Sequence, residues 1–174
     1  MKLPPPAWPR FLPAGWAAAV ATLGPVGRRL PAPGTWGAAS GLLSFVLLCR
    51  GCYPGDAVNV LVGVLAGYAA VGICDAAERQ LGRPDPPEVI ADEFAAMPWC
   101  FLGWSALPAV LPGWGVLLLG FGLFRFFDIL KPCGIARLQA LPGGWGIVLD
   151  DTAAALATCL SLHIVLGLWA AALR

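Results

Sequence analysis

The stretch that decides the fold covers residues 124–151 and reads FRFFDILKPCGIARLQALPGGWGIVLDD. It begins inside an apolar run, and a second apolar run, TAAALATCLSLHIVLGLWAAAL, follows it at once. Its charged residues include Arg125, Asp128, Lys131, Asp150 and Asp151. Charges at the edge of hydrocarbon cost free energy, so they usually have a function there. The stretch therefore predicts a site for a metal ion and an anion at a membrane surface.

The composition of the whole chain supports a membrane protein. Of 174 residues, 59% are hydrophobic and 12% are charged, whereas soluble domains carry about 25% charged residues. A soluble protein of this size would not hide so much apolar surface. The net charge is only +1, and no basic patch interleaved with aromatic residues indicates a nucleic-acid partner. We therefore expect one integral membrane domain.

Apolar runs alternate with polar connections rich in proline and glycine. The runs cover residues 36–49, 57–74, 94–111, 116–130 and 152–173. The first is shorter than the roughly 20 residues of a perpendicular span, so whether it crosses fully stays open. We expect an all-α integral membrane protein, a small bundle of four to five transmembrane helices. Residues 1–29 form a Pro-rich cytoplasmic lead, and residues 30–174 form the membrane domain.

The distribution of charge predicts the orientation. If five runs span, most basic residues fall on the side of the N-terminus, which the positive-inside rule assigns to the cytoplasm. Every acidic residue except Asp56 falls on that same side. An acidic cluster and a basic cluster therefore meet at one face, and we expect an active site at the cytoplasmic face.

The clustered acids are Asp92, Glu93, Asp128, Asp150 and Asp151, all predicted near cytoplasmic helix ends. Carboxylates cannot crowd together while ionised without compensation, and oxygen ligands select Mg²⁺, Mn²⁺ or Ca²⁺. Mg²⁺ keeps positions open for phosphate oxygens. The bases Arg125 and Lys131 would hold a phosphate. At a membrane edge that phosphate would belong to a lipid.

Each of these features also has a purely structural interpretation. Paired acids at a helix start complement the helix dipole, and Arg125 can simply pair with Asp128 at i,i+3. Several glycines would offer backbone N–H groups to phosphate or merely form turns: Gly34, Gly37, Gly143, Gly144 and Gly146. The loop acids Asp85 and Glu88 give a weaker signal. The predicted placement of the acid pairs, the bases and the glycines at one face is what favours a functional site.

Other chemistries find less support. His163 is the only histidine, and it lies about 18 Å along a helix from Asp151, so we expect a packed or hydrogen-bonded role for it. The glycine-rich loops lack the lysine and hydroxyl residue of a nucleotide-binding loop. A membrane transporter or ion-handling protein would use the same carboxylates, but few polar residues continue across the predicted runs. A catalytically inactive membrane partner of lipid synthesis is a third possibility.

Four sequence blocks resemble the phosphatidylglycerophosphatase A family. They are LPAPGTWG at 30–37, IADEFAAM at 90–97, FRFFDILKPCGI at 124–135 and GGWGIVLDD at 143–151. The resemblance implies a small multi-pass enzyme of the bacterial inner membrane that converts phosphatidylglycerophosphate to phosphatidylglycerol with Mg²⁺.

The resemblance also implies site residues. The acids of the family's motifs fall here on Asp92, Glu93, Asp128, Asp150 and Asp151, as catalytic and metal-binding residues. Arg125 and Lys131 stand beside them as phosphate-binding residues. The implied partner is an anionic phospholipid substrate in the membrane, and the implied reaction is metal-assisted displacement at phosphorus.

Overall fold

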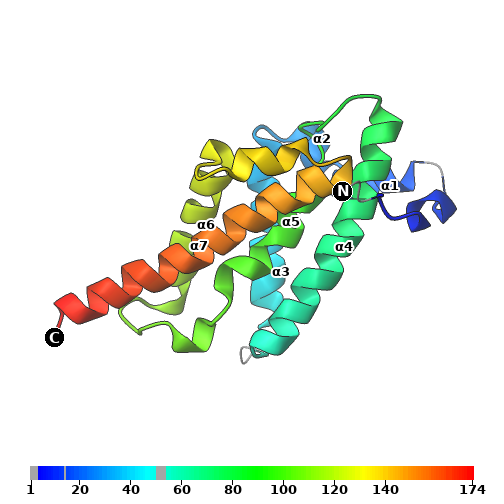
Figure 1. Cartoon of the computed structure of the whole chain (residues 1–174). Coiled ribbons are helices and arrows are strands. Elements are labelled where there is room, and N and C mark those ends of the chain that lie inside the picture. Colours follow the sequence, from blue (N-terminus) through cyan, green and yellow to red (C-terminus); the bar gives the residue numbers. More distant parts are fainter. Residues whose placement is uncertain (1–3, 14, 50–53) are drawn as a thin grey trace.

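The structure is a computed structural model, and it describes residues 4–13, 15–49 and 54–174. Every regular element within these residues is helical, which confirms the all-α expectation for them (Figure 1). The elements in chain order are η1 (Trp8–Phe11), α1 (Trp16–Ala21), α2 (Val26–Arg29), α3 (Pro33–Leu48), α4 (Asp56–Leu81), α5 (Ala91–Ala96), η2 (Met97–Phe101), η3 (Trp104–Ala106), α6 (Gly113–Leu130), η4 (Ile135–Ala140) and α7 (Gly144–Ala172).

Three helices, α4, α6 and α7, are long and apolar enough to cross a membrane. The shortest of them, α6, is about 27 Å long at 1.5 Å per residue, against a hydrocarbon core of about 30 Å. Helix α3 is apolar but has only 16 residues. It corresponds to the first expected run, whose crossing was open. By length and composition, the described residues thus contain three continuous candidate spans, and the expected bundle of four to five transmembrane helices stays a prediction.

The run 94–111, expected as one helix, is broken into short pieces. Helix α5 ends at Ala96, and the 3-10 turns η2 and η3 follow it. Pro98 in η2 has no N–H to donate to an α-helical ladder, which explains the break. The segment still reaches the start of α4, where the Gly103 N–H donates to Asp56 Oδ1 at 2.6 Å.

The core lies where α6, α7 and the broken segment meet. Phe101 and Phe124 are fully buried there. The ring of Phe101 packs so closely on α6 that a Cβ at Gly120 would lie 2.6 Å from a ring carbon. Phe45 of α3 stacks on the same ring, with centroids 4.8 Å apart. A glycine and three aromatic rings thus fix the spacing of three elements.

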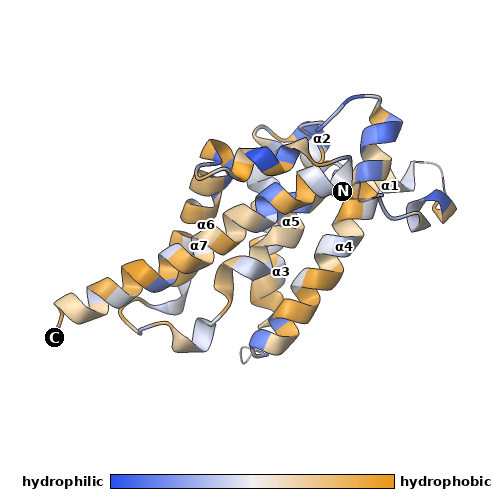
Figure 2. Ribbon diagram, viewed as in Figure 1, coloured by the Kyte–Doolittle hydropathy of each residue, from blue (hydrophilic) through white to orange (hydrophobic). Residues whose placement is uncertain are grey.

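The outward faces of the long helices stay apolar, as Figure 2 shows by the orange ribbons along the bundle. Several large apolar side chains are more than half exposed: Leu43, Leu65, Leu118, Leu160 and Leu168. An exposed apolar surface of this extent is unusual for a soluble monomer and fits contact with hydrocarbon.

Helix α7 begins at Gly144, earlier than the expected start at residue 152. A Cβ at Gly144 would collide with the carbonyl oxygen of Val71, so this glycine lets α7 pack directly against α4. The early start places Asp150 and Asp151 inside the helix rather than at its end.

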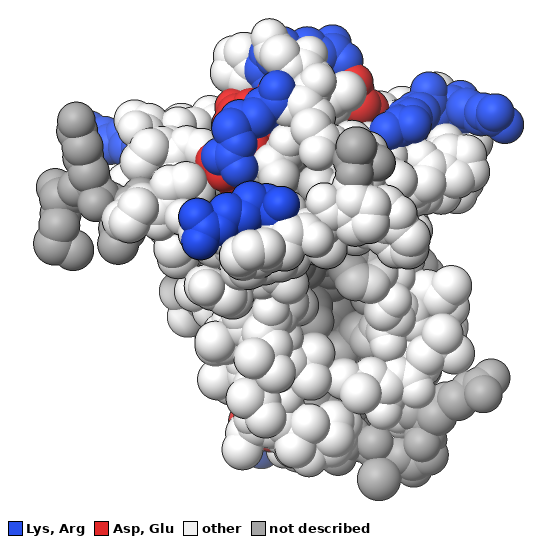
Figure 3. All heavy atoms as spheres, turned by 90° about the vertical axis from the view of Figure 1, so that its right-hand side faces the viewer, with Lys and Arg blue, Asp and Glu red and all other residues white. Residues whose placement is uncertain are grey.

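Charged side chains gather at one end of the bundle. In Figure 3 the blue and red atoms lie mainly at the upper end of the visible face, and the middle of that face is uncharged. That end carries the starts of α3, α5 and α7 and the end of α6 (Figure 1). The fold therefore brings four helix ends together at a polar surface.

Candidate functional site

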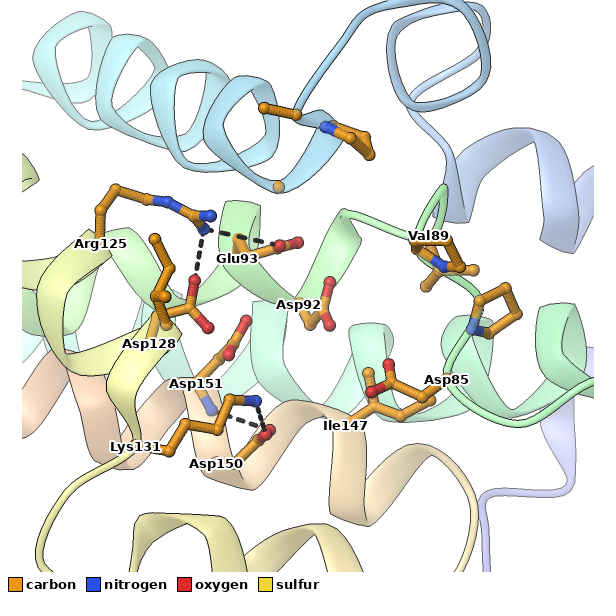
Figure 4. A pocket seen from close by; sticks show the side chains of 16 residues that line it. Asp85, Val89, Asp92, Glu93, Arg125, Asp128, Lys131, Ile147, Asp150 and Asp151 are labelled. Carbon is orange, nitrogen blue, oxygen red and sulfur yellow. Dashed lines mark hydrogen bonds and ion pairs between the residues drawn. The ribbon is translucent and has the colours of Figure 1, made fainter.

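A cavity of about 330 Å³ opens at the charged end of the bundle. Its wall comes from the start of α3, the loop before α5, α5 itself, the end of α6 and the early turns of α7. All the site residues predicted from the sequence line it (Figure 4): Asp92, Glu93, Arg125, Asp128, Lys131, Asp150 and Asp151. The structure thus gathers in one cavity residues that the sequence only assigns to one face.

Asp92, Glu93 and Asp151 form a group of three carboxylates. One carboxylate oxygen of each lies within 4.8 Å of those of the other two. Each residue also has a buried oxygen without a hydrogen-bond partner in the described part of the chain: Asp92 Oδ1, Glu93 Oε2 and Asp151 Oδ2. Buried, unpartnered carboxylate oxygens are costly. Because the donor set is entirely oxygen, it fits a hard divalent cation.

The remaining two acids each hold a base. Arg125 pairs with Asp128 one turn later on α6, as the i,i+3 spacing predicts, and its Nη1 also lies 3.8 Å from Glu93 Oε1. Lys131 pairs with Asp150 across the gap between α6 and α7. The side chains of Arg125 and Lys131 are only 18% and 20% exposed. Two bases are therefore held in fixed positions beside the three carboxylates, an arrangement that suits a phosphate group.

Burial raises the pKa of the α5 carboxyls. It is the larger cause for both Asp92 and Glu93, and repulsion from neighbouring carboxylates adds to it. The pKa of Glu93 rises to about 8. Burial opposes the charge of Lys131, but its hydrogen bond and attraction to Asp150 outweigh this and raise its pKa. Without a cation, Glu93 therefore holds a proton at neutral pH while Lys131 stays charged.

The position of Asp150 and Asp151 argues against a helix-dipole role for them. Helix α7 begins at Gly144, so both acids lie beyond its first turn, where the dipole effect has faded. Asp92 and Glu93 do lie in the first turn of α5, but that helix has only six residues. Complementing the helix dipole therefore does not explain Asp150 and Asp151.

Backbone strain concentrates around the same cavity. Ala32, Asp85 and Lys131 all line it, and their φ angles are 51°, 43° and 43°. Left-handed conformations at non-glycine residues cost about 1–3 kcal/mol each and cluster at functional sites. At Lys131 this conformation ends α6, and its N–H donates to the Phe127 carbonyl at 2.8 Å. The strained backbone directs the chain back across the cavity toward α7.

The structure separates the glycines that the sequence offered for phosphate binding. Gly34 lines the cavity, and a Cβ there would collide with the Glu93 carboxylate. Gly143 and Gly144 instead pack closely against Asp75 and α4. Gly34 thus leaves room for the Glu93 carboxylate, whereas Gly143 and Gly144 allow the start of α7 to pack against α4.

Asp85 lines the cavity, although the sequence gave only a weak indication that it belongs to the site. It lines the wall, whereas its loop neighbour Glu88 pairs with Arg83. A signal was present in the sequence, since an acid between two prolines lies seven residues before Asp92. His163 behaves as expected: its Nδ1 lies 2.9 Å from the Cys159 carbonyl oxygen on its own helix.

Comparisons with known proteins identify the family of this chain. The family model described as phosphatidylglycerophosphatase A matches residues 19–166. A Haemophilus influenzae protein named "Phosphatidylglycerophosphatase A" is 34% identical over 127 residues, which cover 72% of this chain and 74% of the relative. A Bacteroides thetaiotaomicron protein named "Putative phosphatidylinositol-3-phosphatase" is 33% identical over 91 residues, 52% of this chain and 55% of that relative. No solved structure matches. The chain therefore belongs to the phosphatidylglycerophosphatase A family.

Proposed function

We propose that this protein is a Mg²⁺-dependent lipid phosphatase that hydrolyses phosphatidylglycerophosphate to phosphatidylglycerol and phosphate. The single observation that carries the proposal is the cavity in which three carboxylates, each with one oxygen that lacks a hydrogen-bond partner among the described residues, lie beside two fixed bases. Family membership supports the substrate. The names of both relatives describe removal of a phosphate from a lipid headgroup.

The cation would be held by Asp92, Glu93 and Asp151, because their oxygens converge and each carries an unpartnered atom. A divalent cation bound there supplies a Lewis acid and lowers the pKa of coordinated water. Three oxygen ligands leave further positions for water and phosphate, which suits Mg²⁺.

Arg125 and Lys131 would bind the oxygens of the terminal phosphate. Arg125 is oriented by Asp128, and Lys131 is oriented by Asp150. The other oxygen of Asp150 accepts the N–H of Asp151 at 3.0 Å, so the Lys131 side chain is tied to the backbone of α7. Bases held in this way stabilise the charge on phosphorus oxygens without reorganising during the reaction.

The reaction forms one bond from a water oxygen to phosphorus and breaks the bond from phosphorus to the headgroup oxygen. The headgroup oxygen leaves with a proton, as the alcohol of phosphatidylglycerol. The proton lost from water has acceptors nearby in the cavity carboxylates. All seven residues thus act within one site: three would hold a cation, Arg125 and Lys131 would bind the phosphate, and Asp128 and Asp150 orient those two bases.

The site would lie at the cytoplasmic face of the bacterial inner membrane. This placement is supported by the greater number of basic residues predicted on the side of the charged end than on the opposite side. It is also supported by three helices with the length and composition of membrane spans. A lipid phosphate then meets the cavity at headgroup depth. The transport alternative is less well supported, since polar side chains such as Thr158 and Ser161 bond to carbonyls of their own helix.

The test is phosphate release by detergent-purified protein from phosphatidylglycerophosphate, with phosphatidic acid in parallel. Release that favours phosphatidylglycerophosphate supports the proposal, and release from phosphatidic acid alone would change the substrate. No release from either lipid by folded protein would contradict it, and a cation-flux assay in liposomes would follow.

A further inference from the structure

Asp85 occupies a position in the cavity that the proposed chemistry does not use. The cavity acids Asp92, Asp128, Asp150 and Asp151 are buried, whereas Asp85 is exposed at its rim. Figure 4 shows Asp85 and Arg125 on opposite sides, with Asp92 between them. In the part of the chain that the structure describes, Asp85 forms no ion pair with Lys or Arg. Its carboxylate is therefore available to a ligand that enters the cavity.

The loop that carries Asp85 holds it in a defined position. Its φ is 43°, and its N–H donates to Glu78 Oε1 at 3.2 Å. The next residue, Pro86, is fully buried. The pair between Arg83 and Glu88 closes the loop around it. Three interactions on both sides of Asp85 thus stabilise a backbone conformation that is unfavourable by itself.

The charge of Asp85 selects what it can contact. A carboxylate accepts hydrogen bonds and repels other anions. Since the phosphate would be drawn to Arg125 and Lys131 deeper in the cavity, the rim meets the part of the substrate that follows the phosphate. A hydroxyl group on the carbon next to the one that bears the reacting phosphate would donate a hydrogen bond to Asp85, and an anionic group on that same carbon would be disfavoured.

We propose that Asp85 is a specificity residue that accepts a hydrogen bond from a hydroxyl on the headgroup carbon chain next to the reacting phosphate. The inference rests on the proposed function, because it assigns the phosphate to the two bases. It selects phosphate monoesters of a hydroxylated headgroup, such as glycerol, over a phosphate attached directly to diacylglycerol. Phosphatidylglycerophosphate has that hydroxyl, and phosphatidic acid lacks it.

The experiment compares kcat/KM for these two lipids in wild type, Asp85→Asn and Asp85→Gly. Asparagine and glycine both tolerate positive φ, so neither change should unfold the loop, and thermal unfolding in detergent checks this. A hydrogen bond to a charged group is worth about tenfold or more in binding. We expect Asp85→Gly to lower kcat/KM for phosphatidylglycerophosphate about tenfold, mainly through KM, and to leave phosphatidic acid unchanged. Asp85→Asn should fall between.

The matched control is Glu88→Gln, which removes an acid on the same loop but keeps a side-chain oxygen that can accept the hydrogen bond from Arg83 and so keep the loop closed. It should leave the ratio of the two kcat/KM values unchanged. The proposal is overturned if Asp85→Gly leaves the ratio unchanged, or if both lipids lose turnover equally, which would assign Asp85 to shared machinery.

A wild type that hydrolyses neither lipid would contradict the proposed function instead. The hydroxyl claim is then tested by calorimetric titration of wild type and Asp85→Gly with glycerol 3-phosphate and with ethyl phosphate. A preference for glycerol 3-phosphate that disappears in Asp85→Gly supports it, and equal binding of the two esters by wild type overturns it.

Discussion

Glu93 and Asp151 lie on different helices, yet their carboxylate oxygens come within 4.8 Å of each other inside the bundle. Both also carry a buried oxygen without a hydrogen-bond partner among the described residues. A folded chain keeps such a pair only when something compensates the repulsion. A proton does so in the absence of metal, since the pKa of Glu93 is raised to about 8, and a divalent cation would do so during turnover.

Replacing a carboxylate of this group should separate activity from folding. We predict that Asp92→Asn and Glu93→Gln each lower phosphate release by more than about a hundredfold, because a cation ligand is lost. The metal-free proteins should unfold at the same temperature as wild type or higher, since the amide variants avoid the free-energy cost of protonating or burying a carboxylate on folding. Thermal unfolding and phosphate release on the same preparations check both parts. Full activity in either variant would remove that residue from the site.

The pair between Lys131 and Asp150 should show strong coupling in a double-mutant cycle. Lys131→Met leaves the Asp150 carboxylate buried and unpaired, so we expect a loss of about 3 kcal/mol in unfolding free energy. Asp150→Asn combined with Lys131→Met should recover most of it but none of the activity. Denaturant unfolding in detergent measures the cycle. Additive losses in the double variant would show that the two side chains act independently.

A side chain at Gly34 should displace the Glu93 carboxylate. A Cβ at Gly34 would collide with the Glu93 carboxylate, so Gly34→Ala should displace a cation ligand and lower turnover at least about tenfold. Gly122→Ala is the matched control, because nothing lies within 4 Å of the added carbon. It should keep full activity and gain up to about 1 kcal/mol from helix propensity. Equal effects of the two variants would contradict the close approach of α3 to Glu93.

The need for Mg²⁺ should depend on pH. The pKa of Glu93 is raised to about 8, so at a lower pH Glu93 is protonated in the metal-free protein. A cation must then displace that proton in order to bind. We therefore predict that the Mg²⁺ concentration for half-maximal activity rises as the pH falls from 8 to 6. In Glu93→Gln that pH dependence should weaken. A half-maximal concentration that stays constant over this range in wild type would contradict the role of Glu93.

Some features of the site could be predicted from the sequence because they depend on local spacing. The pairing of Arg125 with Asp128 follows from their i,i+3 positions, and the gathering of acids at one face follows from the alternation of apolar runs. The division of the acids into a group of three and two base-paired members could not be predicted. It depends on how α5, α6 and α7 are rotated against one another.

The errors in the expected helices have physical causes of the same kind. The glycines before Asp150 predict a loop, but Gly144 packs closely on Val71 and α7 begins at Gly144. The apolar run 94–111 reads as a span, but Pro98 interrupts it. Asp85 gave a weak signal, since only the folded loop turns it toward the cavity.

The most direct test of the account measures cation binding and turnover together. Mn²⁺ binding to the purified protein is followed by electron paramagnetic resonance, and phosphate release from phosphatidylglycerophosphate is followed with Mg²⁺ and with EDTA. We predict Mn²⁺ binding that Mg²⁺ displaces and that Glu93→Gln abolishes, together with phosphate release that EDTA stops. Release that continues undiminished in EDTA, or cation binding that survives in Glu93→Gln, would contradict it.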